Sequence, residues 1–434
     1  MNRRLTLIIG LGVLLGARVA AAQEVTIGYQ GLPYKSSGEH NTGINLGEGV
    51  LMHVGLGAEA GYDSNVFYGS TSAATPIATS GIIRTTGYVE INNGTRTGAA
   101  PSGLNYSARA GMMYRRYTST DNGVDKYANA FMPSAGLSIG GNAGPWSFGL
   151  TDAFVRLEDP PYQAAGAGPI ARDNNVAGAQ LQWSPGGGRI TTTLRYNNII
   201  DIFEVGSTYD YANNLTHLVM LDVSWKWLPK TAIFVQASQG WVTYLNGAAA
   251  TTGTGKFDSY PLHAIAGLRG LVTPKTTVVA ALGYANAFYS SGATTSGFLG
   301  SSYVDLQATV TPTMLSRVVL GYRQDFQNSV ISSFYYSYSV YASYVQQVAG
   351  RLALDLSGRF DHRQYEGLLF DTMGSRTDNV VLAGASLDYF IRNWAYAGLG
   401  YSVVANFSDY RLPTSGAPVD YVKHQVFARL GVTY

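Results

Sequence analysis

The chain has 434 residues, a formal net charge of +2 and no cysteine. Its near-neutral balance excludes a strongly basic nucleic-acid binder, and the lack of cysteine excludes disulfides, zinc–thiolate sites and a lipid-bearing cysteine. Only 13% of the residues are charged, where about 25% is usual, while tyrosine and glycine are heavily used. So few charges cannot coat several soluble domains, which favours one large closed β-structure.

Residues 1–22 have the pattern of a secretory signal peptide. Arg3 and Arg4 precede an apolar run at 5–15, and small residues at 20–22 provide a cleavage site. The run is too short to cross a bilayer, and no later run approaches ~18 apolar residues, so no transmembrane helix is expected. Apolar and polar residues do not alternate regularly over residues 23–48. This predicts a periplasmic N-terminal lead-in or a segment that lies inside the mouth of a barrel.

Apolar and polar residues alternate along most of the remaining chain. Val54, Leu56 and Ala58 alternate with Gly55 and Glu59, and the same period of two recurs at 83–91, 104–112 and 351–360. Successive side chains of a strand point to opposite faces, so this period predicts strands with one apolar and one polar face.

The predicted connections between these strands are of two kinds. Short turns, most of them marked by proline or glycine, are expected at 140–145, 184–188, 228–230, 273–275, 311–313, 346–350 and 391–393. Longer polar stretches lie between them, at 63–80, 158–172, 197–213, 245–259, 289–301, 327–333, 366–377 and 406–418. Short turns on one side and long loops on the other are typical of outer-membrane barrels of Gram-negative bacteria. We therefore predict an all-β fold, a transmembrane up-and-down antiparallel β-barrel of about 18 strands over residues 49–434, in the outer membrane.

The last strand ends on an aromatic residue at the carboxyl terminus. Its apolar face carries Val426, Ala428, Leu430, Val432 and Tyr434, and its other face is mostly polar. This placement resembles the carboxy-terminal assembly signal of outer-membrane barrels, which implies recognition by the barrel assembly machinery. An ordinary edge strand of a soluble sheet is the alternative.

Tryptophan placement offers an independent test of the membrane prediction. Five tryptophans lie within a few residues of the short turns, at Trp146, Trp183, Trp225, Trp227 and Trp394. Only Trp241 lies nearer a long stretch. Tryptophan favours the membrane interface, where its ring is apolar and its N–H finds a polar partner. Core aromatics of soluble sandwiches are the alternative interpretation.

Two positions disturb the alternation. Pro133 removes a backbone donor from an otherwise regular strand. The apolar face of 146–157 shifts register after Leu150, which predicts a β-bulge near Asp152 that keeps its charge away from lipid.

No catalytic constellation is present. The six histidines show no metal-binding spacing, and the sequence has no nucleophile elbow or phosphate loop, so we predict no catalytic residue, metal or cofactor, and no enzyme. The polar faces are expected to line the lumen with Glu59, Arg84, Glu90, Arg109, Arg115, Arg195, Arg269, Arg317, Arg323, Arg351, Asp355, Arg359, Asp361, Arg363 and Arg429. Such charges either line a water-filled passage or pair with one another across strands.

Inward tyrosines leave a similar choice. They are expected at Tyr88, Tyr117, Tyr335, Tyr341, Tyr396 and Tyr421. Aromatic rings beside polar groups suit a carbohydrate path, and they equally suit strand packing.

Several short segments carry a family resemblance. Residues 46–55, 61–68, 152–160, 172–175 and 183–189 resemble beta-barrel porin-2-like outer-membrane proteins. The resemblance implies that the protein accompanies an exopolysaccharide-export system. Residues 23–48 would then face a periplasmic polysaccharide-export protein. It names no catalytic residue.

Three functions follow as hypotheses. The leading one is an outer-membrane conduit for a secreted polysaccharide, and the second is a general diffusion porin for small solutes. A structural or adhesive surface protein, or a rare barrel enzyme, is the third. Steady conductance without a partner distinguishes the porin. The sequence does not decide the oligomeric state, the transported molecule or whether loops fold into the lumen.

Overall fold

The computed structural model describes residues 43–47, 49–70, 77–93, 103–158, 171–204, 209–246, 256–290, 302–348, 350–369, 371, 374–413 and 416–434. The predicted signal peptide lies outside these residues, as does the predicted lead-in apart from residues 43–47.

Strands make up nearly all of the described chain. They are β1 (Ile44–Gly47), β2 (Val50–Asp63), β3 (Ser80–Asn92), β4 (Asn105–Tyr117), β5 (Ala130–Ala143), β6 (Trp146–Leu157), β7 (Arg172–Trp183), β8 (Ile190–Phe203), β9 (Asn214–Leu228), β10 (Thr231–Tyr244), β11 (Leu262–Thr273), β12 (Thr276–Asn286), β13 (Ser302–Val310), β14 (Ser316–Asn328), β15 (Ser332–Val348), β16 (Leu352–Leu368), β17 (Arg376–Arg392), β18 (Ala395–Ser408) and β19 (Tyr421–Thr433). Short helical turns are η2 (Asp121–Gly123), α2 (Val124–Tyr127) and η3 (Asp210–Ala212). Among the described residues, no helix is long and apolar enough to cross a membrane.

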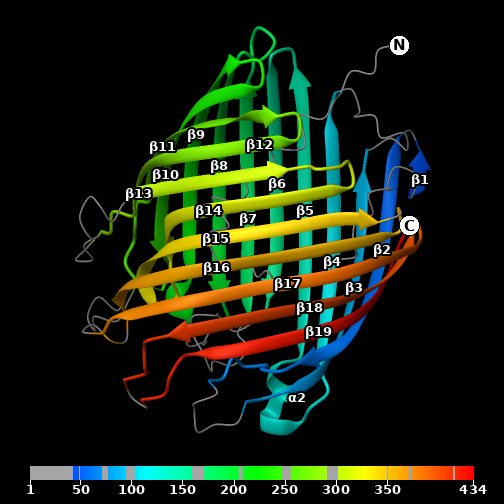
Figure 1. The fold of residues 1–434 in the computed structure, drawn as a ribbon, viewed down its shortest axis with the longest axis vertical. Coiled ribbons are helices and arrows are strands. Elements are labelled where there is room, and N and C mark those ends of the chain that lie inside the picture. Colours follow the sequence, from blue (N-terminus) through cyan, green and yellow to red (C-terminus); the bar gives the residue numbers. More distant parts are fainter. Residues whose placement is uncertain are drawn as a thin grey trace.

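The strands close into a single barrel. Each strand from β2 to β18 pairs antiparallel with the next, and β19 pairs with β2, so 18 strands form the wall (Figure 1). The short β1 adds to the start of β2. Reciprocal backbone hydrogen bonds of 2.9 Å between Val54 and Tyr434 complete the seam. The predicted closed barrel and its strand number are confirmed.

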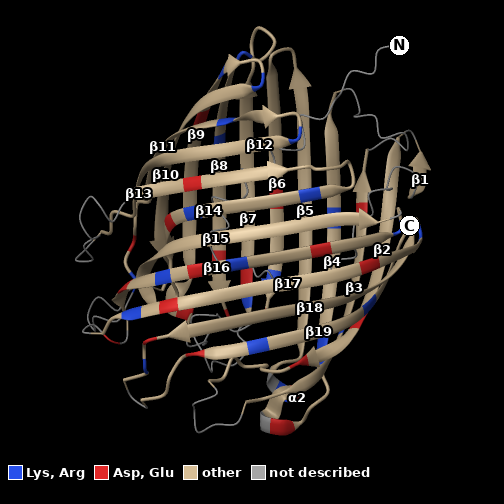
Figure 2. Ribbon diagram, viewed as in Figure 1, with Lys and Arg blue, Asp and Glu red and all other residues tan. Residues whose placement is uncertain are grey.

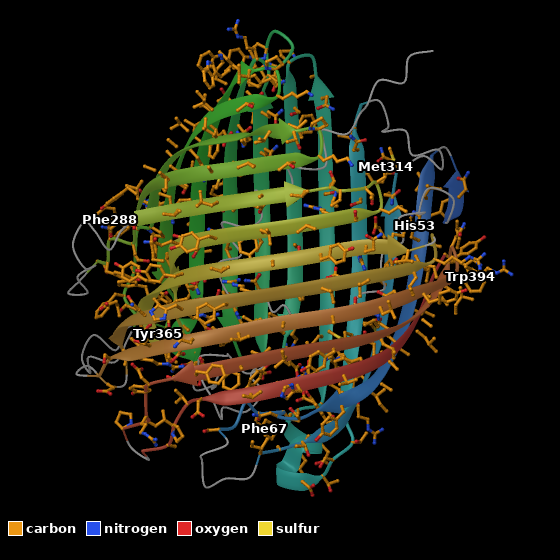
Figure 3. The ribbon with its side chains drawn as sticks, viewed as in Figure 1. His53, Phe67, Phe288, Met314, Tyr365 and Trp394 are labelled. Atoms are coloured by element: carbon orange, nitrogen blue, oxygen red, sulfur yellow. The ribbon has the colours of Figure 1, made fainter. Side chains whose placement is uncertain are left out.

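The wall has the tilt that barrel closure requires. In Figure 1 the strands of the front wall, β14 to β19, run across those of the rear wall, β5 to β8. Strands inclined to the barrel axis give this crossing when a barrel is seen from the side. His53 and Trp394 lie toward the end that holds the carboxyl terminus, while Phe67, Phe288 and Tyr365 lie toward the opposite end (Figure 3).

The two ends of the barrel differ in their connections, with four departures from the expected pattern. The stretch predicted at 197–213 begins only at residue 204, because β8 continues to Phe203. A connection that carries η2 and α2, at 118–129, was not expected at the long-loop end. The stretch predicted at 327–333 shortens to residues 329–331, because Asn328 still pairs with Phe334. At the short-turn end, the β3–β4 connection spans 93–104 and is not short.

Most strands present a largely apolar outer face. On β19, Val426, Leu430 and Tyr434 are exposed, whereas Phe427 and Arg429 on the other face are buried. In a barrel too large to be filled by its side chains, exposed apolar residues on the convex face require an apolar solvent. The period of two in the sequence thus becomes an outside and an inside.

The β-bulge predicted near Asp152 is absent. Asp152 pairs regularly with Leu137 and Ala177, and it stays on the outer face, where Asn175 Nδ2 donates to its carboxylate at 2.8 Å. The prediction was wrong because the strand keeps its regular pairing and Asn175 supplies a hydrogen bond to the carboxylate on the outer face. Pro133 is accommodated within regular β5, opposite Met112.

Candidate functional site

The charged residues predicted to line the lumen lie on the inner strand faces, with one exception. They are Glu59, Arg84, Glu90, Arg109, Arg115, Arg195, Arg269, Arg317, Arg323, Asp355, Arg359, Asp361, Arg363 and Arg429, each on the face opposite the exposed apolar residues of its strand. Arg351 instead occupies the turn between β15 and β16, where its carbonyl accepts a hydrogen bond from Phe390 N at 2.7 Å. Figure 2 shows residues of both charges along the strands of the front wall.

One row of inner charges crosses the seam between the last and first strands. Arg429 on β19 donates through Nε to Asp388 on β17 at 2.7 Å, and its Nη2 binds the second carboxylate oxygen. Glu59 on β2 lies opposite both Arg429 and Arg84, and Arg84 Nη1 is 3.4 Å from its carboxylate. These four residues tie β17, β19, β2 and β3 together where the barrel closes.

The Asp388–Arg429 ion pair passes over β18 at Gly398. A Cβ at this position would lie 2.0 Å from Asp388 Oδ1 and 2.9 Å from Arg429 Nε. Glycine is therefore required here for a close approach of side chains, and its backbone conformation is not the reason.

Several inward aromatic rings lie over glycines of the neighbouring strand. The directly paired positions are Gly55 with Tyr88, Gly61 with Phe427, Gly267 with Phe234, Gly321 with Tyr341 and Gly431 with Tyr396. At Gly55, Gly321 and Gly431, a Cβ would lie between 2.0 and 2.3 Å from the ring. The rings are thus held along the wall, an arrangement that shields the glycine backbone and pins strand register.

The other inward tyrosines are also engaged in the wall. Tyr117 donates to Asp63 at 3.1 Å, Tyr335 packs on Tyr365, and Tyr421 packs edge-on against Tyr68. The six tyrosines considered for a carbohydrate path therefore serve strand packing, which was the alternative interpretation.

The turn between β14 and β15 anchors a buried lysine from a distant loop. Lys256 precedes β11, and its Nζ donates to the carbonyls of Ser329 and Ser332 at 2.7 Å and of Ser333 at 3.1 Å. Burial lowers the pKa of Lys256 to about 7. The segment 256–260 is fixed to this turn.

Two further loops reach the same turn. Tyr211 in η3 donates to Val330 O at 2.9 Å, although the four strands β10 to β13 separate η3 from this turn along the wall. Tyr289 donates to Ser333 O at 3.0 Å and stacks on Phe334. Loops anchored to a point several strands away narrow the mouth of the barrel at its long-loop end.

The β2–β3 connection enters the barrel from the seam side. Its Tyr68 is buried against Val380, Leu382 and Val404, which belong to the inner faces of β17 and β18, and it has a positive φ of 52°. A left-handed tyrosine is uncommon and needs support from its surroundings. Asn65 supplies part of it by hydrogen bonding to both backbone groups of Gly69, at 2.7 and 2.8 Å.

Asp63 anchors this connection at the end of β2. Its fully buried carboxylate accepts hydrogen bonds from Asn65 N, Tyr117 Oη and Gln425 Nε2, and lies 3.0 Å from Lys423 Nζ. Strands β2, β4 and β19 therefore meet at one carboxylate.

The outer wall carries two aromatic girdles. At the short-turn end, Trp146, Trp183, Trp225, Trp227 and Trp394 are exposed, as the sequence predicts. At the long-loop end, Trp241 lies opposite His217 on the neighbouring strand. A ring nitrogen of His217 is hydrogen bonded to Tyr196 Oη at 2.8 Å, and His424 is hydrogen bonded in the same way to Tyr401 Oη at 2.9 Å. An apolar belt between two amphipathic aromatic girdles matches the depth profile of a bilayer. The protein is an outer-membrane β-barrel.

Comparison with known proteins finds solved structures of low similarity. No family model matches the chain, and no curated protein is similar in sequence. OccAB3 of Acinetobacter baumannii is 10% identical with a TM-score of 0.47, covering 88% of this chain and 99% of its own. OccK9 (OpdG) of Pseudomonas aeruginosa is 10% identical with a TM-score of 0.45, covering 88% and 98%. The siderophore receptor PirA of Pseudomonas aeruginosa is 8% identical with a TM-score of 0.44, covering 88% and 80%. These comparisons do not confirm the resemblance to porin-2-like proteins.

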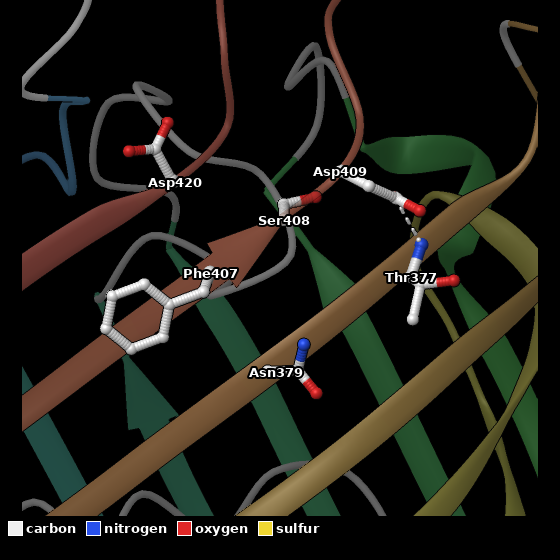
Figure 4. Close-up of a pocket in the computed structure, with 6 residues that line it drawn as sticks. All are labelled: Thr377, Asn379, Phe407, Ser408, Asp409 and Asp420. Carbon is white, nitrogen blue, oxygen red and sulfur yellow. Dashed lines mark hydrogen bonds between the residues drawn. The ribbon is translucent and has the colours of Figure 1, made fainter.

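A groove of about 390 Å³ lies outside the lumen, at the long-loop end of β17 and β18 (Figure 4). It is lined by Thr377, Asn379, Phe407, Ser408, Asp409 and Asp420. Thr377 N donates to Asp409 at 2.8 Å across it. Since Asn379 and Phe407 lie on outer strand faces, this groove belongs to the outer surface of the barrel and does not line the passage.

The sequence did not indicate which residues shape the mouth. Lys256 and Tyr68 lie in polar stretches without alternation, and their roles depend on contacts with strands far away in the chain. Asp63 was the first residue of a predicted loop, but it is the last residue of β2. Gly398 resembles any other strand glycine in the sequence.

Proposed function

We propose that the barrel is a passive channel for hydrophilic solutes across the outer membrane. The observation that carries this proposal is the partial solvent exposure of Arg269, Arg323 and Arg359, which lie within strands on the inner face of a closed wall. Charged side chains that meet solvent inside a closed wall imply a wet interior. Barrels of 16 to 18 strands are wide enough for an aqueous passage.

Conductance of the purified protein tests this proposal. Reconstituted into planar bilayers without any partner, the barrel is expected to give stepwise insertions with steady, ohmic conductance. Protein unfolded by heat before addition is the control. Correctly folded barrels that insert without conducting would contradict the proposal.

A polysaccharide conduit is the second candidate. It is supported by the resemblance of residues 46–55, 61–68 and 152–160 to porin-2-like proteins, some of which accompany exopolysaccharide export. A periplasmic polysaccharide-export protein would then bind at the short-turn end, near residues 23–48. The packing of the inward tyrosines removes one argument for it. A deletion strain with normal surface polysaccharide would contradict this candidate, whereas loss of the polymer despite normal outer-membrane permeability would favour it.

A further inference from the structure

In four ion pairs of the inner wall the acid is clearly more deeply buried than the arginine beside it, whereas in the Arg429–Asp388 pair both side chains are almost fully buried, at 1% and 3% exposed. The Arg269 side chain is 33% exposed and its partner Asp222 11%, Arg359 is 30% exposed and Asp361 0%, and Arg323 is 22% exposed and Asp325 6%. Arg172 and Asp201 follow the same order. At these four pairs the lumen meets guanidinium groups, with the carboxylates behind them, whereas Asp355 on the same inner wall is itself exposed.

The described ion pairs of the outer wall show no such order. Arg156 is 28% exposed, and its partners Glu158, Asp173 and Glu204 are 19%, 41% and 64% exposed. Two of these three acids are more exposed than the arginine that they bind, so the greater length of arginine does not by itself place it nearer to solvent than its partner.

Two of the buried acids each bind a second basic side chain. Asp361 accepts from Arg359 Nε at 2.6 Å through one oxygen and from Arg363 Nη2 at 2.9 Å through the other. Asp325 accepts from Arg323 at 2.9 Å and is 3.0 Å from His263 Nε2. The carboxylate oxygens are thus turned toward protein donors, and the lumen is left with the positive member of each cluster.

These clusters adjoin across β15. Arg323 on β14 and Asp361 on β16 both lie opposite Ser339, and Arg359 Nη2 donates to the Ser339 hydroxyl at 3.2 Å. Because the Ser339 side chain is short, it leaves space over the inner face of β15 between Arg323 and Arg359. Arg323 and Arg359 consequently belong to one basic surface that spans three strands.

We propose that this inner wall makes the passage selective for anions and favours solutes that carry carboxylate or phosphate groups. The inference deepens the proposed channel function and rests on it. A guanidinium group offers forked donors that match carboxylate and phosphate oxygens. Charge of one sign on low-dielectric walls also concentrates counter-ions in the passage, even where the total charge is nearly balanced.

Ion selectivity in planar bilayers tests the inference, with chloride and potassium as the probes. The permeability ratio of chloride to potassium is obtained from the reversal potential in a salt gradient. The test variant combines R269Q, R323Q and R359Q. Asp325 keeps His263 and Asp361 keeps Arg363, so these two acids retain a basic partner. The matched control is R156Q on the outer wall, and the single variant R359Q is measured as well.

The wild-type ratio is expected to exceed one, and the triple variant to lower it by about twofold or more. R359Q is expected to fall between the two, and R156Q to match the wild type. A conducting wild-type barrel that prefers potassium overturns the inference and leaves the channel function intact. The same holds if R359Q and the triple variant both keep the wild-type ratio. A folded barrel that conducts no ions overturns the proposed function and this inference together.

Discussion

Gly398 shows that packing at the seam of the barrel depends on the residue type at single positions. The Asp388–Arg429 ion pair crosses β18 only because residue 398 has no Cβ. Breaking a buried pair leaves an uncompensated charge, which costs more than the pair itself contributes. Substitutions that disturb this buried ion pair are therefore expected to have the largest effects on stability.

A methyl group at Gly398 is expected to destabilise the barrel. Gly398→Ala places Cβ against Asp388 and Arg429, and overpacking of this kind costs about 1–3 kcal/mol. The free energy of unfolding by urea in lipid vesicles measures the effect. Gly400→Ala is the control, since Gly400 lies on the same face of β18 with nothing near its Cβ direction. Equal stability of both variants would contradict the prediction.

The anchoring of Lys256 is expected to strengthen as pH rises above 7. Burial lowers its pKa from 10.5 to about 7, so between these values the anchored segment binds fewer protons than a released one. Rising pH therefore favours the anchored form across this window, and below about pH 7 the dependence flattens. Hydrogen-exchange protection of residues 256–260, corrected for intrinsic exchange, measures it. In Lys256→Met the dependence should vanish, and an unchanged dependence in that variant would assign it to another group.

At the scale of elements, connections determine the shape of the mouth while strands determine the wall. The β8–β9, β10–β11 and β12–β13 connections all reach the β14–β15 turn. On the seam side, the β2–β3 connection places Tyr68 on the inner faces of β17 and β18. These contacts narrow one end of the barrel, so conductance should respond to them.

Removal of the Tyr68 ring is expected to raise single-channel conductance. Tyr68→Ala vacates space against the inner wall, and the increase should be on the order of tens of per cent, because the other loops remain. Tyr68→Phe keeps the ring and should conduct like the wild type. If Tyr68→Ala conducts no better than Tyr68→Phe, this connection does not limit the passage.

At the scale of the whole molecule, closure depends on the last strand. Tyr434 both donates to and accepts from Val54 at 2.9 Å, and its ring lies exposed at the short-turn girdle. The outward residues Val426, Ala428, Leu430 and Val432 continue that face, which we propose the barrel assembly machinery recognises.

Deletion of Tyr434 is expected to lower the folded fraction in the outer membrane severalfold. The deletion removes both closing hydrogen bonds and the terminal aromatic side chain. Heat-modifiable mobility in denaturing gels measures folded barrel in membrane extracts. Tyr434→Phe keeps the backbone and an aromatic ring and should assemble normally. Efficient assembly of the deletion variant would show that Tyr434 is not part of the assembly signal.

The sequence by itself determined the strands, their two faces, their closure into one barrel and the end at which most tryptophans gather. It could do so because lipid outside and water inside impose a period of two on every strand, and this period is local. The pattern also placed most of the inner charges. It failed at Asp152, where a hydrogen bond from Asn175 serves a carboxylate that stays on the outer face of a regular strand, and at Arg351, which lies in a turn.

Only the tertiary structure decided which charges pair, which acids lie behind arginines, and where the loops attach. Asp388 and Arg429 are 41 residues apart, and Lys256 and Ser329 are 73 residues apart. Such contacts depend on the stagger of strands around the closed wall, and no local pattern encodes that stagger. The same stagger exposes Arg269, Arg323 and Arg359 to the lumen and places their partner carboxylates behind them.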